Sequence, residues 1–180
     1  MKKFLLYLPI LVAIFLIVGC NYQNPVVMSD CEYVDSPGLG PNDPYIVNMI
    51  TSGNTAIGIL KVWKDRDFMH CEFTAKSNYS FGNIHLHITP DKSKIPMSGG
   101  CPDLDKFRYT IHNLPANTKS YAFSYPIIKY PVAYNYYYIT AEIDFENSVD
   151  HPDCNYAWAA GLSFTTCSDF AKYFTFKING

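Results

Sequence analysis

The chain has 180 residues, and its 14 Lys and Arg against 16 Asp and Glu give a formal net charge of −2 at pH 7. This mildly acidic balance, with basic residues scattered along the chain, excludes the strongly basic surface that nucleic-acid binding requires. Aromatic residues are unusually frequent, with 15 Tyr and 12 Phe, and they favour β-strands.

The N-terminal segment has the three parts of a bacterial export signal. Two lysines precede an apolar run from Phe4 to Val18, and Gly19 is a small residue directly before Cys20. A cysteine at that position is typical of a lipoprotein signal, in which a peptidase cuts before Cys20 and acyl chains are attached to its thiol and amine. Two or more chains anchor a protein durably. The alternative is an uncleaved transmembrane helix, but the run has about 15 residues where a span needs about 20.

Three parts of the chain are therefore predicted. Residues 1–19 are a signal peptide, residues 20–43 are the lipidated Cys20 with a flexible tether, and residues 44–180 are a single domain. The tether is rich in Asn, Pro, Gly and Asp, which favour irregular structure. We expect the protein to be lipid-anchored to a membrane of the bacterial cell envelope. In a cell with two membranes, Asn21 favours the outer membrane or cell surface, since it is not the Asp that retains many lipoproteins at the inner membrane.

The domain is predicted to be all-β, because no long segment has helical periodicity and turn residues separate short runs. Strands are expected over residues 45–51, 56–64, 68–75, 83–89, 107–112, 120–128, 136–145, 156–164 and 170–178. The second and third form a hairpin that turns at residues 65–67, and residues 90–105 form a loop. About nine strands without crossover helices predict an antiparallel β-sandwich, jelly-roll or Ig-like.

Alternation in the strand over residues 136–145 assigns its two faces. The predicted core face carries Tyr137, Ile139, Ala141, Ile143 and Phe145. The opposite face carries Tyr136, Tyr138, Thr140, Glu142 and Asp144.

Five cysteines follow Cys20, namely Cys31, Cys71, Cys101, Cys154 and Cys167. An exported protein can form disulfides, and an odd number leaves at least one thiol free or paired between chains. Cys154 and Cys167 could staple the loop of one hairpin, although the sequence does not fix the pairing. Alternatively, several are simply small buried apolar residues. None has the CxxC spacing of a zinc or redox site.

Six short motifs occur in a fixed order along the domain. Residues 60–63 are similar to T-V-W, residues 84–89 to T-H-L-H-V-G, residues 95–107 to an I-P…P…F loop, residues 140–143 to A-A-H-A, residues 155–158 to E-T-A-W, and residues 170–176 to W-A-T-Y-F-x-Y. Together they resemble a domain of bacterial exported and surface proteins whose function is undefined. Glu142 and Asn155 depart from the His and Glu of that pattern. The resemblance implies a compact exported β domain and no particular chemistry.

His85 and His87 are the candidate metal ligands. An HxH on a strand puts both imidazoles on one face, about 7 Å apart along the chain, and imidazole suits zinc, copper or iron. A third ligand could come from Glu142, His112, His151 or Asp169. The alternative is that both histidines decorate a half-exposed sheet face or hydrogen-bond to neighbouring tyrosines. No cofactor is expected beyond the covalent lipid.

No catalytic residue is nominated, because the chain has no G-x-S-x-G, H-E-x-x-H or P-loop motif. Glu142 and Asp144 could in principle act as acid and base in glycoside hydrolysis. Alternating acids, however, commonly mark a solvated face.

The candidate binding residues are Tyr136, Tyr138 and Trp158, whose rings could stack on sugars or anchor a protein partner. The alternative is that these rings only pack within the sandwich. We expect a non-enzymatic, membrane-anchored domain that presents a binding or structural surface to an envelope protein or a glycan. The rival is a metal-binding protein or hydrolase that uses His85 and His87.

Overall fold

The computed structural model describes residues 40–127, 136–146 and 155–178. The predicted signal peptide, Cys20 and nearly all of the tether lie outside the described residues. Within the described part of the chain, none of the helices has the length and apolar character needed to cross a membrane.

The described residues contain twelve strands and two short 3-10 helices, so the all-β prediction is confirmed. The strands are β1 (Tyr45–Ile50), β2 (Ala56–Lys64), β3 (Phe68–Ala75), β4 (Ser80–Thr89), β5 (Met97–Ser98), β6 (Cys101–Pro102), β7 (Tyr109–Ile111), β8 (Ser120–Pro126), β9 (Tyr136–Glu146), β10 (Tyr156–Ala159), β11 (Leu162–Ser163) and β12 (Lys172–Lys177). The helices are η1 (Lys92–Lys94) and η2 (Leu104–Lys106).

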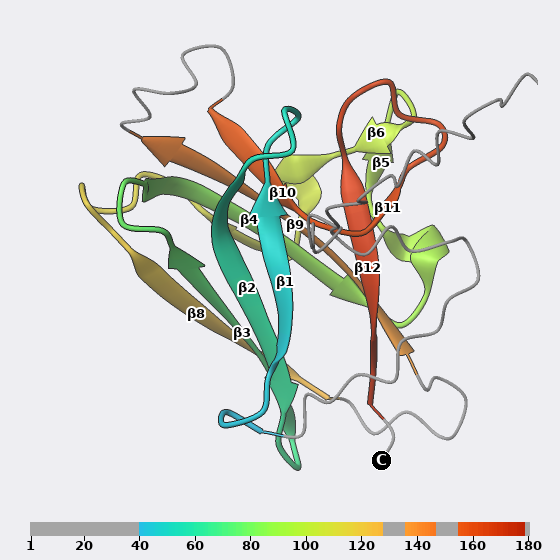
Figure 1. Cartoon of the computed structure of the whole chain (residues 1–180). Coiled ribbons are helices and arrows are strands. Elements are labelled where there is room, and N and C mark those ends of the chain that lie inside the picture. The colour runs from blue at the N-terminus through green and yellow to red at the C-terminus, as the bar shows by residue number, and fades with distance from the viewer. Residues whose placement is uncertain (1–39, 128–135, 147–154, 179–180) are drawn as a thin grey trace, which may run out of the picture.

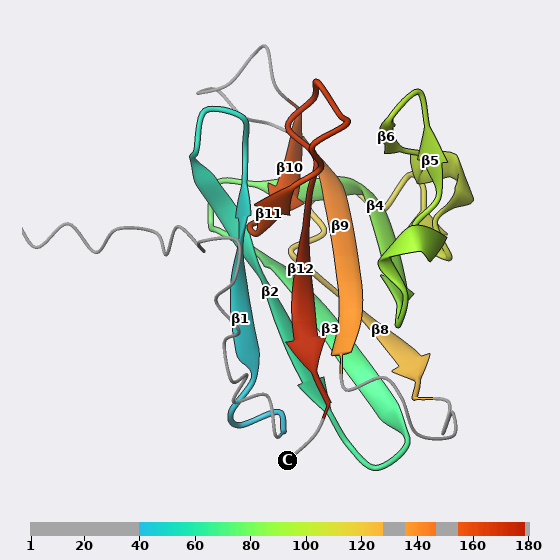
Figure 2. The same ribbon diagram turned by 90° about the vertical axis from the view of Figure 1, so that its right-hand side faces the viewer.

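One antiparallel sheet runs in the order β11-β12-β9-β10-β1-β2-β3-β8, and β4 pairs with both β9 and β7. β9 is central to it. β4 pairs along most of β9, while β12 pairs with the first half of β9 and β10 with the second half. The sheet curls until β1, β2, β3 and β8 face β4, β9 and β12, which gives a sandwich-like domain (Figures 1 and 2).

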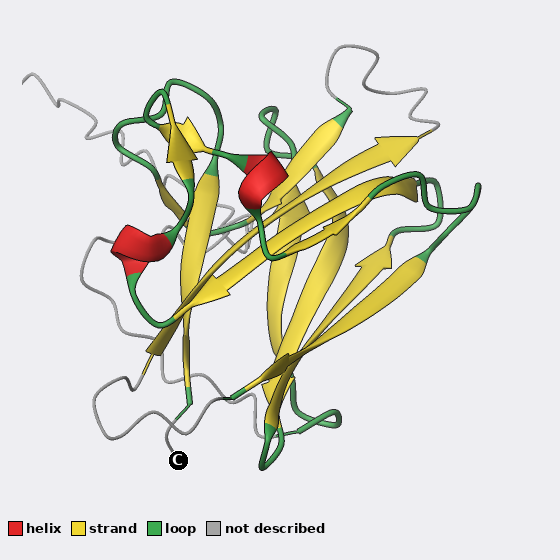
Figure 3. Cartoon of the chain, turned by 180° about the vertical axis from the view of Figure 1, so that it is seen from behind, coloured by secondary structure: helices red, strands yellow, loops and turns green. Residues whose placement is uncertain are grey.

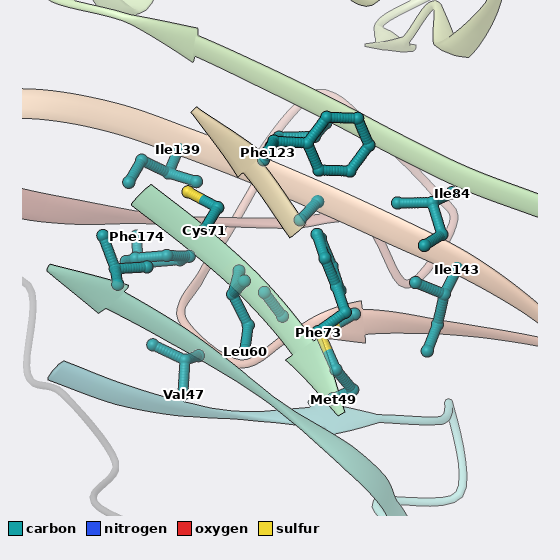
Figure 4. Packing of buried hydrophobic residues seen from close by; sticks show 14 of the residues in the cluster. Val47, Met49, Leu60, Cys71, Phe73, Ile84, Phe123, Ile139, Ile143 and Phe174 are labelled. Carbon is teal, nitrogen blue, oxygen red and sulfur yellow. The ribbon is translucent and has the colours of Figure 1, made fainter. Parts of the chain in front are cut away.

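The main core fills the space between these two halves (Figure 4). Ring contacts cross it: the ring centroids of Phe73 and Phe81 are 6.5 Å apart, and those of Tyr125 and Tyr137 are 5.7 Å apart. The predicted inner face of β9 is confirmed, because all five of its residues are buried in this core. Each large apolar side chain buried here contributes about 1.5–3 kcal/mol.

The predicted hairpin is confirmed as β2 and β3, which pair from Gly58 and Ala75 to Lys64 and Met69. Its turn is fixed by Asp65, whose Oδ1 accepts hydrogen bonds from the backbone N–H groups of Asp67 and Phe68 at 2.8 and 2.7 Å. An aspartate that bonds its own downstream backbone in this way favours a tight turn.

Two other strand predictions are wrong in detail. The single strand expected over residues 156–164 is broken into β10 and β11. A Cβ at Gly161 would lie 2.2 Å from the carbonyl oxygen of Tyr173, so the chain passes β12 closely at a position that only glycine fits. The strand expected over residues 107–112 is confined to β7, because η2 and its cap occupy the preceding residues.

The loop predicted over residues 90–105 contains η1, the β5–β6 hairpin and η2. We call residues 90–108 the covering segment. It lies over the outer face of β4 and β9, away from β1 and β2 (Figures 2 and 3). Its Ile95 packs with Trp158, Phe164, Ala171 and Tyr173 to form a second apolar cluster. This segment turns an otherwise open sheet face into an enclosed one.

Candidate functional site

Strand register brings three of the predicted site residues into one row. Antiparallel pairing sets His85 of β4 opposite Glu142 of β9, and Trp158 of β10 opposite Glu142 on the other side. Paired residues of neighbouring strands point to the same face of a sheet, which is here the outer face. All three are buried, with exposed fractions of 6% for His85, 3% for Glu142 and 5% for Trp158.

A pocket of about 280 Å³ lies beside this row. It is lined by Cys101, Pro102, Leu104, Glu142, Tyr156, Trp158, Cys167, Asp169 and Ala171. Two aromatic side chains of β10 and the buried carboxyl group of Glu142 therefore share one cavity. Asp169 is exposed and places a second carboxylate where the cavity reaches the surface.

A disulfide forms part of the pocket wall. Cys101 of the covering segment is joined to Cys167, which follows β11, across 66 positions of the sequence. Thr166 reinforces the same junction by donating a hydrogen bond from Oγ1 to the carbonyl oxygen of Gly100 at 2.7 Å. The disulfide thus ties together the two segments that enclose the cavity.

Burial favours the neutral form of the Glu142 carboxyl group. Burial is the main cause that raises its pKa well above the usual value, and the neighbouring Asp144 on β9 acts in the same direction. Its Oε2 atom is buried and has no hydrogen-bond partner. A neutral carboxyl group can both donate and accept hydrogen bonds, so Glu142 has unused capacity next to the pocket.

His85 is also held neutral. Burial is the largest cause that lowers its pKa, and His112, whose ring centroid is 5.5 Å away, adds to the effect, while Asp144 opposes it. His85 Nδ1 is buried without a partner, and Nε2 lies 3.8 Å from Glu142 Oε2, which is too far for a hydrogen bond. Unsatisfied buried polar atoms cost about 1–3 kcal/mol each and often mark functional sites.

His87 shares the outer face with His85 but contacts different residues. Its ring packs against Phe107 with centroids 5.5 Å apart, and its Nδ1 accepts a hydrogen bond from the backbone N–H of Arg108 at 3.4 Å. Burial is the main cause that lowers its pKa. His87 is therefore turned towards the covering segment, and the structure does not gather the two histidines with Glu142 as a compact ligand set.

The alternative function, a metal-binding protein or hydrolase that uses His85 and His87, requires several ligand atoms close together. In the described part of the chain, one group of three potential ligand atoms lies within 4.8 Å, formed by Cys101, Cys167 and Asp169. The two sulfur atoms of that group are joined in a disulfide and do not act as thiolate ligands. Of the third ligands considered, His112 lies beside His85, Asp169 lines the pocket, and His151 is outside the described residues.

The aromatic residues predicted to bind a ligand do not form one open platform. Tyr138 packs against Tyr173 with ring centroids 6.2 Å apart, and Tyr136 is half-buried near the start of β9. Trp158 lies in the pocket wall. Tyr156 was not predicted as a site residue, although it lies two residues before Trp158 on the same strand and so shares its face. Asp169 was considered only as a metal ligand.

The structure contradicts the predicted Cys154–Cys167 pairing, and it supports the alternative that some cysteines are buried apolar residues. Cys167 is bonded to Cys101, so the Cys154–Cys167 pairing is wrong. Cys154 and Cys31 lie outside the described residues. Cys71 is free and buried in the main core, where burial raises the pKa of its thiol to about 12. It behaves as a small apolar residue.

Comparisons of the chain with protein-family models, with curated proteins and with solved structures find no match. The motif resemblance to an exported bacterial domain stays a prediction.

Proposed function

We propose that the protein is an exported, lipid-anchored domain that binds a glycan in the pocket formed by Glu142, Tyr156 and Trp158. The observation that carries this proposal is the buried Glu142 Oε2, which has no partner, on a residue that lines a cavity with two aromatic walls. Sugars combine apolar ring faces with hydroxyl groups. Aromatic side chains pack against the faces, and a small number of fixed polar groups orients the hydroxyls.

The proposed location comes from the sequence. The signal before Cys20 and the irregular segment that follows it favour a domain tethered outside the cytoplasm. A disulfide such as Cys101–Cys167 suits an oxidising compartment.

A glycan is favoured over an envelope protein by the shape of the surface. A stable protein interface buries about 800 Å² on each partner and usually has a contiguous apolar centre. Among the described residues, the exposed large apolar side chains are Ile46, Phe68 and Met97, which belong to three different strands, β1, β3 and β5. The concave pocket therefore fits a single sugar ring better than it fits the surface of a protein partner.

A glycan array with the full-length protein in detergent micelles tests the proposal. We expect selective binding that falls roughly tenfold or more in Tyr156→Ala, because removing a well-packed aromatic contact costs about 1–3 kcal/mol. Tyr121→Ala, on a strand of the opposite half, serves as the control and should bind normally. Thermal unfolding of each variant establishes that it is folded. The absence of glycan binding, or equal binding by both variants, would contradict the proposal. Capture of an envelope protein unaffected by Tyr156→Ala would support the other partner class.

A further inference from the structure

Two carboxyl side chains line the pocket, that of Glu142, whose burial favours the neutral form, and that of Asp169. Glu142 lies at the buried side and Asp169 at the exposed side, and the described lining residues include no Lys, Arg or His. The remaining lining is aromatic, aliphatic or disulfide. A cavity of this composition presents hydrogen-bond acceptors and π-electron faces to its contents.

The basic groups near the pocket do not neutralise these carboxyls. His85 is held neutral by burial, as described above. The ammonium of Lys172 is 3.1 Å from Ser163 Oγ and lies over the ring of Phe170 at 4.5 Å. Lys106, in the covering segment, pairs with Asp103 at 2.7 Å. Among the described residues, no Lys or Arg forms an ion pair with Glu142 or Asp169.

We infer that the pocket selects glycans that carry a protonated amine, so that the ligand is an amino sugar with a free ammonium group. This inference rests on the proposed glycan-binding function and specifies its ligand class. An ammonium group offers three hydrogen-bond donors and no acceptor. It therefore complements the unpartnered Glu142 Oε2, the carboxylate of Asp169 and the rings of Tyr156 and Trp158 together, through charge-assisted hydrogen bonds and cation–π attraction.

The two carboxyls have different parts in this recognition. Asp169 is exposed and accessible to solvent, so it attracts a cation at the entrance of the cavity. Glu142 is deep, and a hydrogen bond from the ligand would satisfy the oxygen that the folded protein leaves without a partner. An acetylated amine loses the charge and adds a bulky acetyl group, and a sugar carboxylate is repelled by Asp169.

Three trisaccharides that differ only at the C2 substituent provide the test. They are the glucosamine trisaccharide, with ammonium groups, its fully N-acetylated counterpart, and the glucose trisaccharide with the same linkage. Binding to the full-length protein in detergent micelles is followed by the fluorescence of Trp158. The Trp63→Phe background leaves Trp158 as the single tryptophan. We expect the ammonium form to bind roughly tenfold more tightly than the other two, as one charge-assisted contact allows.

Asp169→Asn should reduce that preference to about threefold or less and leave the affinity for the glucose trisaccharide unchanged. The matched control is Asp67→Asn, which removes the same charge at the β2–β3 turn and should keep the full preference. Equal or tighter binding of the neutral trisaccharides would overturn the inference and leave glycan binding intact. If none of the three binds, the inference is overturned, and an empty glycan array would then overturn the proposed function as well.

Discussion

His85 of β4 and Glu142 of β9 lie directly opposite each other, with 3.8 Å between Nε2 and Oε2. Burial lowers the pKa of the histidine and raises the pKa of the glutamate, so both shifts disfavour an ion pair between them. Each retains a buried polar atom without a hydrogen bond. These two unsatisfied buried atoms destabilise the folded protein beside the pocket. A ligand that forms a hydrogen bond with Glu142 would offset part of this cost.

The first prediction concerns Glu142→Gln and pH. Because the folded protein holds the carboxyl protonated, the wild type loses stability as pH rises from the usual value of 4.5 towards the raised pKa of Glu142. The loss is at most about 1.4 kcal/mol per pH unit. The neutral glutamine lacks this dependence, so the variant should gain stability over the wild type as pH increases.

Urea unfolding between pH 4 and pH 9 measures the effect of Glu142→Gln. His85 acts in the opposite sense, since its lowered pKa costs stability only as pH falls below its usual value of 6.5. His85 is present in both proteins, so the difference between their stabilities isolates Glu142. Parallel stability curves for the two proteins would show that Glu142 ionises normally in the folded state.

The second prediction concerns the Cys101–Cys167 disulfide. Replacing both cysteines with serine should lower the free energy of unfolding by about 2–4 kcal/mol, because the long closed loop regains its freedom in the unfolded chain. It should also weaken ligand binding, since the disulfide lines the pocket. Peptide mapping without reduction should recover the Cys101–Cys167 pair. A Cys154–Cys167 peptide in its place would contradict the structure.

The third prediction concerns Gly161, which directly precedes β11 and lies close to Tyr173 of β12. Gly161→Ala would place a Cβ 2.2 Å from the Tyr173 carbonyl oxygen, so the backbone must move, at a cost of about 1–3 kcal/mol. Gly53→Ala is the matched control, because its Cβ would meet only Thr51 Oγ1 at 3.7 Å. Chemical denaturation should separate the two variants clearly. Similar stabilities would mean that β11 and β12 lie further apart.

The fourth prediction concerns the membrane anchor. Cys20→Ser should abolish incorporation of a labelled fatty acid and move the protein from the membrane fraction to the soluble fraction, because serine lacks the thiol that would be acylated. Cys31→Ser, eleven positions further on, is the control and should remain membrane-bound. An unlabelled wild-type protein that retains residues 1–19 would overturn the lipoprotein interpretation.

The fifth prediction concerns metals. Zinc should not raise the thermal unfolding temperature of the full-length protein by more than it raises that of His85→Ala, because His87 is turned to Phe107 and Arg108. Elemental analysis of the purified protein provides a second measurement. A stoichiometric metal that disappears in a His85→Ala, His87→Ala double variant would favour the rival function.

Local patterns in the sequence predict much of this fold and only part of its site. Alternation assigns Ile139 and Glu142 to opposite faces of β9 because a strand has a strict two-residue period. The covering segment has no such period, since its short helices and two-residue strands depend on tertiary contacts with Trp158 and Tyr173. The disulfide partner of Cys167 cannot be predicted from local sequence patterns for the same reason. It is 66 positions away, and no local rule selects it.

The central position of β9 also determines when the sheet can be completed as the chain is synthesised. A chain that emerges with its N-terminus first can form the β2–β3 hairpin early, because those strands are neighbours in sequence. β4 can pair early with β7, but its longer pairing with β9 has to wait for more than 45 further residues, and β9 also pairs with β10 and β12 near the C-terminus. The emerging polypeptide thus cannot complete its sheet until its last strands have been synthesised.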